Sequence, residues 1–124
     1  MDERDPLTHS VIGAAIEVHR QMGPGLLESV YQACLAEKLR IRDIAFEAQY
    51  RLPLVYKTRS LPDVFILDFF FPGHLVVELK SVERLIPVHE AQLLTYLRLS
   101  QTRIGLLLNF NVPVLKDGMK RMVL

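Results

Sequence analysis

The sequence predicts a mixed α/β fold in which a small sheet is covered by helices. Two stretches near the N-terminus have apolar residues at helical spacing, three central segments have the alternation or apolar content of strands, and another helical pattern precedes a last apolar run. The order helix, helix, three strands, helix, strand is typical of a layered α/β domain. At 124 residues the chain has the length of a single domain, which we assign to residues 1–124.

The first two predicted elements are helices separated by a Gly-Pro-Gly sequence. Thr8 can cap the first helix, whose apolar residues form one stripe up to Met22. The Gly-Pro-Gly sequence then ends this helix. A second helix is expected over residues 26–42, because apolar residues fall on one side of it and charged residues on the other.

Three strands are expected in the middle of the chain. The first covers residues 45–56, where Pro53 indicates an edge position or a bulge. The second and third cover residues 64–70 and 75–80, which are apolar and are joined by a Pro-Gly turn. The sequence therefore predicts a hairpin between the second and third strands.

A helix and an interior strand complete the expected fold. Pro87 stands where a helix can begin, and residues 88–99 have helical spacing. Residues 104–110 are almost wholly apolar, as in an interior strand, so the helix would cross the sheet between two strands. The tail, residues 111–124, is turn-rich and then basic, and no regular element is expected there.

Three charged residues of the predicted hairpin are the strongest candidates for a site. In a hairpin centred on Gly73, Asp68 lies opposite Glu78, and Glu78 shares a face with Lys80. Charges are costly in an apolar sheet unless they are paired or bind a metal. Carboxylates suit Mg²⁺ or Mn²⁺, and a lysine can orient a water or offset developing charge. The alternative is a salt bridge from Lys80 to Asp68, which the apolar surroundings disfavour.

Two further groups carry weaker signals. Gln92 and Tyr96 are four residues apart on the last helix, with His89 one turn earlier, so all three share one face. An amide and a hydroxyl can bind a phosphate or a metal-bound water, but an ordinary polar stripe has the same pattern. Glu28 stands at the opening of the second helix, where the helix dipole favours a carboxylate and a metal could also use it.

Composition and spacing exclude several other chemistries. The histidines lack the spacing of a zinc site, and the patterns of serine hydrolases, P-loops and dinucleotide-binding folds are absent. The single Cys34 indicates a small core residue in a reducing compartment. The charged N-terminus has no signal-peptide pattern and no segment is apolar enough to span a membrane, so we expect a soluble cytoplasmic protein.

The net charge of +1 is too balanced to indicate nucleic-acid binding by itself. Binding would depend on local clusters of basic residues. Six candidates lie in the C-terminal third of the chain: Arg84, Arg98, Arg103, Lys116, Lys120 and Arg121.

Taken together, these segments resemble the PD-(D/E)XK nuclease superfamily, and within it the small bacterial and archaeal GxxExxY proteins. Residues 23–31, Gly-Pro-Gly-Leu-Leu-Glu-Ser-Val-Tyr, resemble the signature of that group. Residues 77–80, Val-Glu-Leu-Lys, resemble the (D/E)XK element, with Asp68 as the preceding acid. Gln92 and Tyr96 resemble the Gln-x-x-x-Tyr motif of the exonuclease branch. The likeness runs nearly from end to end.

The resemblance implies a restriction-endonuclease-like αβββαβ core, here with an extra N-terminal helix, and a divalent metal, Mg²⁺ or Mn²⁺. The site residues that it implies are Glu28, Asp68, Glu78, Lys80, Gln92 and Tyr96. The three acids would bind the metal or support its ligands, the lysine would position the attacking water, and the last two would assist at the phosphate. His19 is similar to an upstream histidine of the exonuclease branch.

The expected function is therefore metal-dependent hydrolysis of phosphodiester bonds in nucleic acid by in-line attack. DNA is the expected polymer. One departure is that relatives often carry a basic residue shortly before the hairpin acid, where this chain has Phe65-Ile66-Leu67. The alternatives are a catalytically inactive nuclease-like module that binds nucleic acid or a protein, and a purely structural protein. A homodimer is also expected, because a minimal domain needs a second copy to engage both strands of a duplex.

Overall fold

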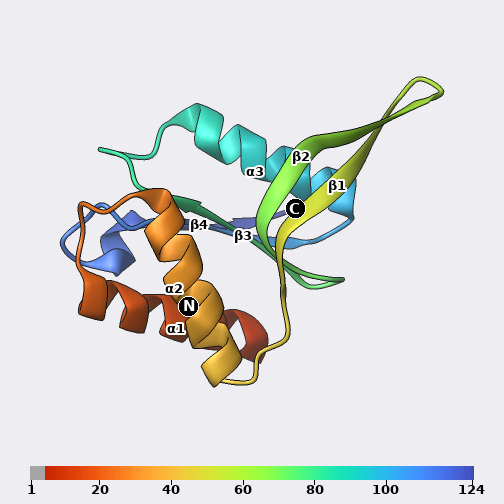
Figure 1. The fold of residues 1–124 in the computed structure, drawn as a ribbon. Coiled ribbons are helices and arrows are strands. Elements are labelled where there is room, and N and C mark those ends of the chain that lie inside the picture. Colours follow the sequence, from red (N-terminus) through yellow and green to blue (C-terminus); the bar gives the residue numbers. More distant parts are fainter. Residues whose placement is uncertain (1–4) are drawn as a thin grey trace.

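The computed structural model describes residues 5–124, apart from the side chain of Asp63, and places three α-helices around one five-stranded sheet (Figure 1). The charged residues 1–4, on which the expectation of no signal peptide partly depended, lie outside the described residues. The elements in order are α1 (Pro6–Met22), α2 (Glu28–Ile41), β1 (Glu47–Tyr56), β2 (Arg59–Phe71), β3 (Leu75–Lys80), α3 (Pro87–Ser100), β4 (Ile104–Asn109), a 3₁₀ turn (Leu115–Gly118) and β5 (Met119–Val123). The predicted αβββαβ core with an extra N-terminal helix is confirmed.

The sheet is mixed, with the strand order β1-β2-β3-β4-β5. The β3 and β4 strands are parallel and are connected through α3, whereas the other neighbours are antiparallel. The predicted crossover helix is therefore confirmed. Pro53 was expected at an edge or a bulge, and both hold, since β1 is an edge strand and its register shifts between Leu52 and Leu54.

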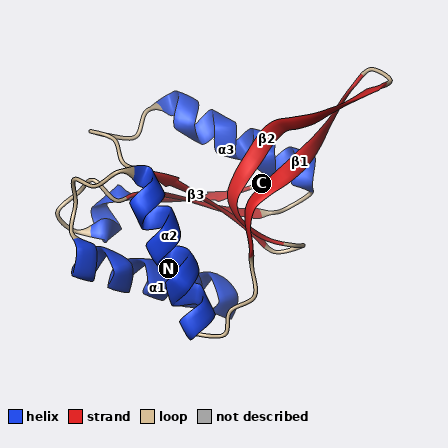
Figure 2. Ribbon diagram, in the orientation of Figure 1, coloured by secondary structure: helices blue, strands red, loops and turns tan. Residues whose placement is uncertain are grey.

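The helices cover both faces of the sheet (Figure 2). On one face α1 and α2 pack on alternate residues of the central strands, including Val77, Leu79 and Leu106. On the other face α3 packs on residues such as Val76 and Leu107. Because both faces of β3 and β4 are covered, these strands are almost wholly apolar, and any charge within them lies in low dielectric.

The predicted hairpin has the expected register. Phe69 pairs with Val77 and Phe71 pairs with Leu75, so the turn is centred on Gly73. Gly73 has φ +74°, a left-handed conformation that glycine adopts at little cost. The register places Val77 and Leu79 against α1 and α2, which leaves Glu78 and Lys80 on the side of α3.

The expected cap of the first helix was wrong, whereas Cys34 packs against the core as expected. The first helix begins at Pro6, so Thr8 is not its cap but lies in the first turn, where its hydroxyl donates a hydrogen bond to the carboxylate of Asp5. Pro6 accounts for the early start, because proline is well suited to the first turn of a helix. Cys34 is half-buried against the α1 and α2 core, at its margin.

One strand is longer than the sequence predicts, and one strand was not expected. The β2 strand begins at Arg59 rather than near Val64, and the tail contains β5. Most residues of both additional segments are exposed or half-exposed, so they lack the buried alternation by which strands are recognised. No helix in the described part of the chain is long and apolar enough to cross a membrane.

Candidate active site

The site begins where the hydrogen-bond ladder between β2 and β3 gives way to side chains. Past the pair Phe69 and Val77, the backbone N–H of Asp68 donates to Oε2 of Glu78, at 2.8 Å. In return Oδ2 of Asp68 accepts a hydrogen bond from the backbone N–H of Leu79, also at 2.8 Å. Each carboxylate therefore replaces a main-chain acceptor, and the two side chains are fixed side by side.

Both carboxylates hold protons more tightly than exposed acids do. Glu78 is only 5% exposed, and its burial, followed by the negative charge of Asp68, raises its pKa well above the ordinary value. Burial also raises the pKa of Asp68, although the Leu79 N–H and the positive charge of Lys80 oppose the shift. The hydrogen bonds and the charge of Lys80 do not fully offset the desolvation and mutual repulsion of the two carboxylates. A divalent cation bound beside them would stabilise their charged forms.

Lys80 and two residues of α3 stand beside the carboxylates, as expected. The ammonium Nζ of Lys80 lies 3.4 Å from Oε1 of Gln92, to which it can donate a hydrogen bond. Tyr96 is 5% exposed, and its burial together with the charges of Glu78 and Asp68 raises the pKa of its hydroxyl. The described residues contain no Lys80–Asp68 salt bridge within 4.0 Å, so the purely structural alternative lacks its central contact.

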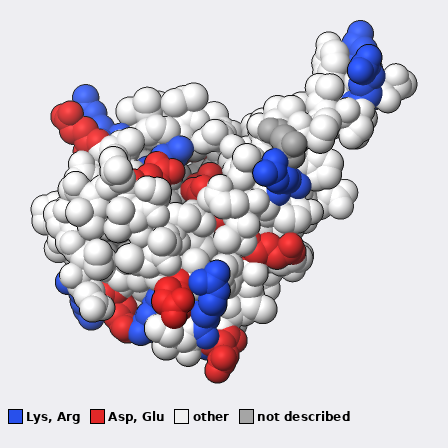
Figure 3. Space-filling view, in the orientation of Figure 1, with Lys and Arg blue, Asp and Glu red and all other residues white. Residues whose placement is uncertain are grey.

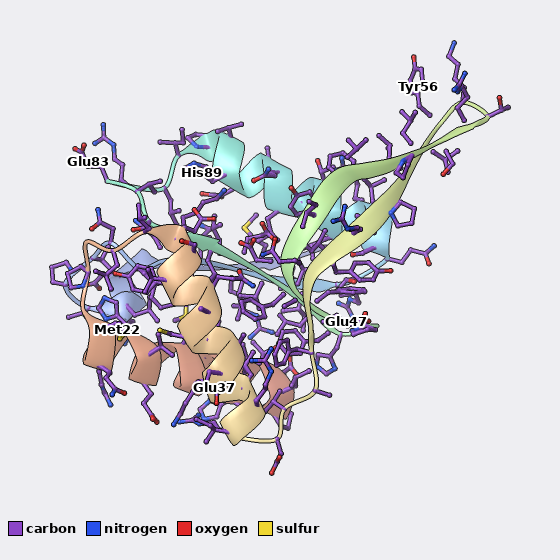
Figure 4. The ribbon with its side chains drawn as sticks, viewed as in Figure 1. Met22, Glu37, Glu47, Tyr56, Glu83 and His89 are labelled. Atoms are coloured by element: carbon purple, nitrogen blue, oxygen red, sulfur yellow. The ribbon has the colours of Figure 1, made fainter. Side chains whose placement is uncertain are left out.

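The approach of α3 depends on a glycine in β4. A Cβ atom at Gly105 would lie 3.0 Å from Cγ of Leu93, closer than side chains normally pack. Leu93 directly follows Gln92, so this close contact also sets how near Gln92 comes to Lys80. His89, expected on the same face, instead accepts a hydrogen bond from the Ile86 N–H at the start of the helix (Figure 4).

Glu28 lies at the edge of the site rather than in hydrogen-bond contact with Asp68 or Glu78. It is the first residue of α2 and is exposed. Partial desolvation of its carboxyl group, followed by the negative charge of Asp68, raises its pKa, while Lys80 opposes this. Figure 3 shows acidic side chains beside a basic one in the hollow between the start of α2 and α3.

The loop that positions Glu28 is held by Tyr31. The Tyr31 hydroxyl donates to the carbonyl oxygen of Gly23 at 2.5 Å and accepts from the N–H of Leu26 at 3.2 Å. Its ring is fully buried and stacks on Phe110, with the centroids 4.5 Å apart. The glycine, glutamate and tyrosine of the expected signature therefore act together, since the tyrosine fixes the turn that starts the helix at Glu28.

Two glutamines at the site were missed in the sequence. The side-chain amide of Gln32 donates to the carbonyl oxygen of Asp68 at 3.1 Å, and that of Gln49 reaches Oδ1 of Asp68 at 3.5 Å. Both residues line a depression of about 330 Å³ together with Glu28, Ser29 and Asp68. Gln32 follows Glu28 by one helical turn, which is a signal that could have found it. Gln49 carries no such signal, because its place depends on strand pairing.

Gln49 also has an unusual backbone. It lies between the ladder pairs Ala48–Phe69 and Tyr50–Leu67, which places it across from Asp68, and its φ is +52°. A residue with a Cβ atom is disfavoured by roughly 1 kcal/mol or more in this left-handed region. Strain of this kind is concentrated at functional sites.

The histidines have structural partners outside this site. His19 is buried, and its Nε2 lies 2.7 Å from the carbonyl oxygen of Val112, beyond the end of β4. Nε2 of His74 lies 2.6 Å from Oδ1 of Asp5, next to the start of α1. The structure does not bring His19 into contact with Asp68 or Glu78. The expected likeness of His19 to the upstream histidine of the exonuclease branch therefore gains no support from the geometry.

The six basic residues of the C-terminal third do not form a single face. Arg103 and Arg121 border a depression next to His74, at the end of β3 opposite to Lys80. Lys116 lines a different depression beside the Gly-Pro turn after α1. The basic surface expected in this third of the chain is thus divided among distant positions.

The donor set fits a hard divalent cation that keeps most of its waters. Within residues 5–124, no group of three or more His, Cys, Asp or Glu side chains is close enough to hold a metal. Asp68 and Glu78 nevertheless form a carboxylate pair, and Mg²⁺ ordinarily takes only one or two protein carboxylates. The structure joins Asp68 and Glu78 through hydrogen bonds and leaves Glu28 apart from them, so a ligand set of three acids stays a prediction.

A buried glutamate beside a half-buried aspartate, with a lysine next to them at the end of a strand ladder, suits an α/β protein to metal-assisted phosphoryl chemistry. Residues 5–122 match the family model of the PD-(D/E)XK nuclease superfamily, and the chain belongs to this superfamily. Its nucleases are generally divalent-metal dependent and act on nucleic acid. Comparisons with curated proteins and with solved structures found no match.

Proposed function

We propose that this protein is a Mg²⁺- or Mn²⁺-dependent nuclease of the GxxExxY group that hydrolyses phosphodiester bonds of DNA. The observation that supports it most is the exchange of hydrogen bonds between Asp68 and the β3 strand, which fixes the half-buried Asp68 and the buried Glu78 side by side next to Lys80. A fold that only needed pairing at this point would use main-chain acceptors and avoid the desolvation of two acids. Their retention favours a role in binding a cation.

Each residue then has a chemical role. A bound divalent cation would supply Lewis acidity toward a phosphoryl oxygen and lower the pKa of a bound water. Asp68 and Glu78 would hold it, and Glu28 would orient waters at its outer side. Lys80, kept in place by Gln92, would offset the negative charge that develops in the transition state. Tyr96 offers a neutral hydroxyl donor to the phosphate, consistent with the upward shift of its pKa.

The choice of DNA rests on the likeness of the α3 residues to the exonuclease branch. Gln92 and Tyr96 lie one turn apart on the helix face that borders Lys80 and Glu78. This placement agrees with the Gln-x-x-x-Tyr motif of the exonuclease branch that the sequence resembles. Linear duplex, circular duplex, single-stranded DNA and RNA, each incubated with Mg²⁺ or Mn²⁺, would show which polymer is cut and whether ends are needed.

The first test is calorimetric titration of Mn²⁺ and Mg²⁺ into the wild-type protein and into Asp68→Asn and Glu78→Gln variants. Both amides retain an oxygen that can accept the hydrogen bonds from Leu79 and Asp68, so they remove charge while keeping strand pairing. Glu37→Gln is the matched control, because Glu37 is an exposed acid of α2 outside the site (Figure 4). We expect saturable binding in the wild type and the control only.

The alternative is a nuclease-like module that binds nucleic acid or a protein without cutting. The absence of a three-residue metal cluster in the described chain is the observation that favours it. Binding of DNA at equal strength with and without metal, with no cleavage of any polymer, would support this alternative. A homodimer is proposed for the active form, and a monomer by gel filtration with light scattering at working concentration would contradict it.

A further inference from the structure

The β1 and β2 strands extend past the sheet as a two-stranded arm, which we define as residues 54–61. The pairs Leu54–Leu61 and Tyr56–Arg59 hold the arm together beyond the register shift that follows Leu52. It projects from the rest of the molecule, beyond the helices that cover the sheet (Figure 1). Figure 4 shows Tyr56 near its tip. Residues 55–60 are all exposed, so the hydrophobic core does not explain the arm.

The tip of the arm is basic. It carries Lys57 and Arg59, and residues 54–61 contain no acid, the next one along the chain being Asp63 on the side nearer the sheet. Neither cation forms an ion pair within the described residues, and Figure 3 shows basic atoms gathered at the end of the arm. Nζ of Lys57 lies 5.8 Å from the centre of the Tyr56 ring, which groups a cation with an exposed aromatic face.

The arm grows directly out of the candidate active site. The β1 strand that forms one side of it also carries Gln49, whose side chain reaches Asp68. Tyr56 is seven positions beyond Gln49, and at the rise of an extended strand seven steps span about 23 Å. Successive base pairs are about 3.4 Å apart along each strand of a duplex, so the tip is about seven base pairs from the carboxylates.

We propose that the arm binds the phosphate backbone of the nucleic-acid substrate about seven base pairs from the bond that is cleaved. The inference rests on the proposed nuclease function, because the distance from the tip is measured to the carboxylates at which cleavage is proposed. Paired cations on an exposed projection suit a polyanion, and Tyr56 adds an aromatic surface that tolerates any sequence. A second copy of the chain is the weaker partner, since a symmetric contact would bring like charges of two tips together.

The arm also supplies positive charge, which the residues just before Asp68 lack. Relatives often carry a basic residue there, whereas this chain has an apolar run that includes Ile66, itself 38% exposed. Lys57 and Arg59 supply positive charge from the same hairpin, displaced outward along it. Substrate binding thereby depends on contacts distant from the cleaved bond, which predicts a dependence on substrate length.

The test measures binding in EDTA, so that no cleavage is required. Fluorescence anisotropy gives Kd for a labelled hairpin duplex of about 5 base pairs and a labelled duplex of about 30 base pairs, of which only the longer spans from the site to the tip. The variants are Lys57→Ala/Arg59→Ala and, as a control with the same charge change outside the candidate binding residues, Arg20→Ala/Arg40→Ala. All four side chains are exposed, so the fold is retained, and circular dichroism verifies it.

We expect the arm variant to bind the long duplex about tenfold more weakly than wild type and the short duplex equally well. Two lost phosphate contacts also reduce the slope of log K against log salt by about two. Equal loss on both lengths, an equal loss in the control, no loss, or no duplex binding by the wild type would overturn the proposal. So would a wild-type dimer that the arm variant converts to a monomer in light scattering.

The nuclease proposal fails separately. If length-dependent binding is lost in the arm variant while no metal supports cleavage of any polymer, the arm contact stands and the catalytic proposal falls. If DNA is cleaved but the arm variant binds and cuts both lengths like wild type, the catalytic proposal stands and the arm contact is refuted.

Discussion

At the residue scale, the central feature is an acid kept where ionisation is unfavourable. Glu78 is buried between two helical layers, and its carboxylate accepts a hydrogen bond from the N–H of Asp68. That bond favours the ionised form, but burial and the neighbouring charge outweigh it, and the pKa is raised. The folded protein therefore binds a proton more tightly at this position than the unfolded chain does.

This proton affinity predicts the pH dependence of stability without metal. Because the folded pKa of Glu78 is raised, its contribution is most favourable below the unfolded pKa of 4.5 and is lost as pH rises through the folded pKa. Asp68 and Glu28 shift in the same direction. Urea unfolding in EDTA from pH 4.5 upward should show a steeper decline for wild type than for Glu78→Gln, and parallel curves would contradict it.

Gln49 gives a second prediction at this scale. Gln49→Gly removes the left-handed strain of the backbone and the amide that favours the ionised form of Asp68. We expect the free energy of unfolding to rise by up to about 1 kcal/mol and the affinity for Mn²⁺ to fall several-fold. Chemical denaturation and calorimetry measure the two quantities.

Gln49→Ala separates the two effects of this substitution, because it removes the amide while keeping a Cβ atom at the strained position. It should weaken Mn²⁺ binding without increasing stability. Unchanged Mn²⁺ affinity in both variants would show that the glutamine is a structural feature of the strand only.

At the scale of elements, the loop between α1 and α2 connects packing to chemistry. Tyr31→Phe keeps the ring stacked on Phe110 but removes the hydroxyl that bonds Gly23 and Leu26. We expect a loss of about 0.5–1.5 kcal/mol of stability, because the part-buried carbonyl oxygen of Gly23 loses its donor. Thermal or urea unfolding measures the loss.

The same variant tests whether the loop positions Glu28. If it does, nuclease activity falls in Tyr31→Phe even at temperatures where the variant is fully folded, and Glu28→Gln combined with Tyr31→Phe loses little more than either change alone. Full activity in a folded Tyr31→Phe variant would limit the role of the tyrosine to stability.

The elements that the sequence predicted well are those whose side chains are buried in a regular pattern. The hairpin register followed from the turn at Gly73, and the apolar runs of β3 and β4 followed from burial on both faces. The Asp68–Glu78 pair was therefore predictable as neighbours. Their hydrogen bonds to the backbone were not, because the ladder ends at that point instead of continuing.

The parts that were missed are held by pairing rather than by burial. The β2 side of the arm, residues 59–61, and β5 expose most of their side chains, so they show neither helical nor strand periodicity in hydrophobicity. Gln49 belongs to the same group, since only the register of β1 on β2 brings it opposite Asp68. The position of such residues depends on contacts between strands that are distant in the sequence. A single sequence gives no spacing pattern from which these contacts could be predicted.

At the scale of the whole molecule, stability and metal binding are linked. A cation that binds the folded carboxylate pair and not the unfolded chain raises the free energy of unfolding, by about 2.7 kcal/mol at a hundred times Kd. The rise should be larger at pH 8 than at pH 5, because protons compete for carboxylates whose pKa values are raised. Thermal unfolding with Mn²⁺ at both pH values measures it.

Two comparisons make this test specific. Asp68→Asn should lose the stabilisation by Mn²⁺, and Glu37→Gln should keep it. Equal stabilisation at both pH values, or in all three proteins, would place the cation elsewhere on the molecule.

The exchange of hydrogen bonds at the end of the β2–β3 ladder also has an evolutionary consequence. Amides at positions 68 and 78 would offer acceptor oxygens to the same two N–H groups. The substitutions Asp68→Asn and Glu78→Gln would therefore remove both negative charges while the strand pairing is kept. They would also remove the energetic burden of two desolvated acids. A lineage that had stopped cleaving would have an open route to a more stable protein, and this chain has not taken it.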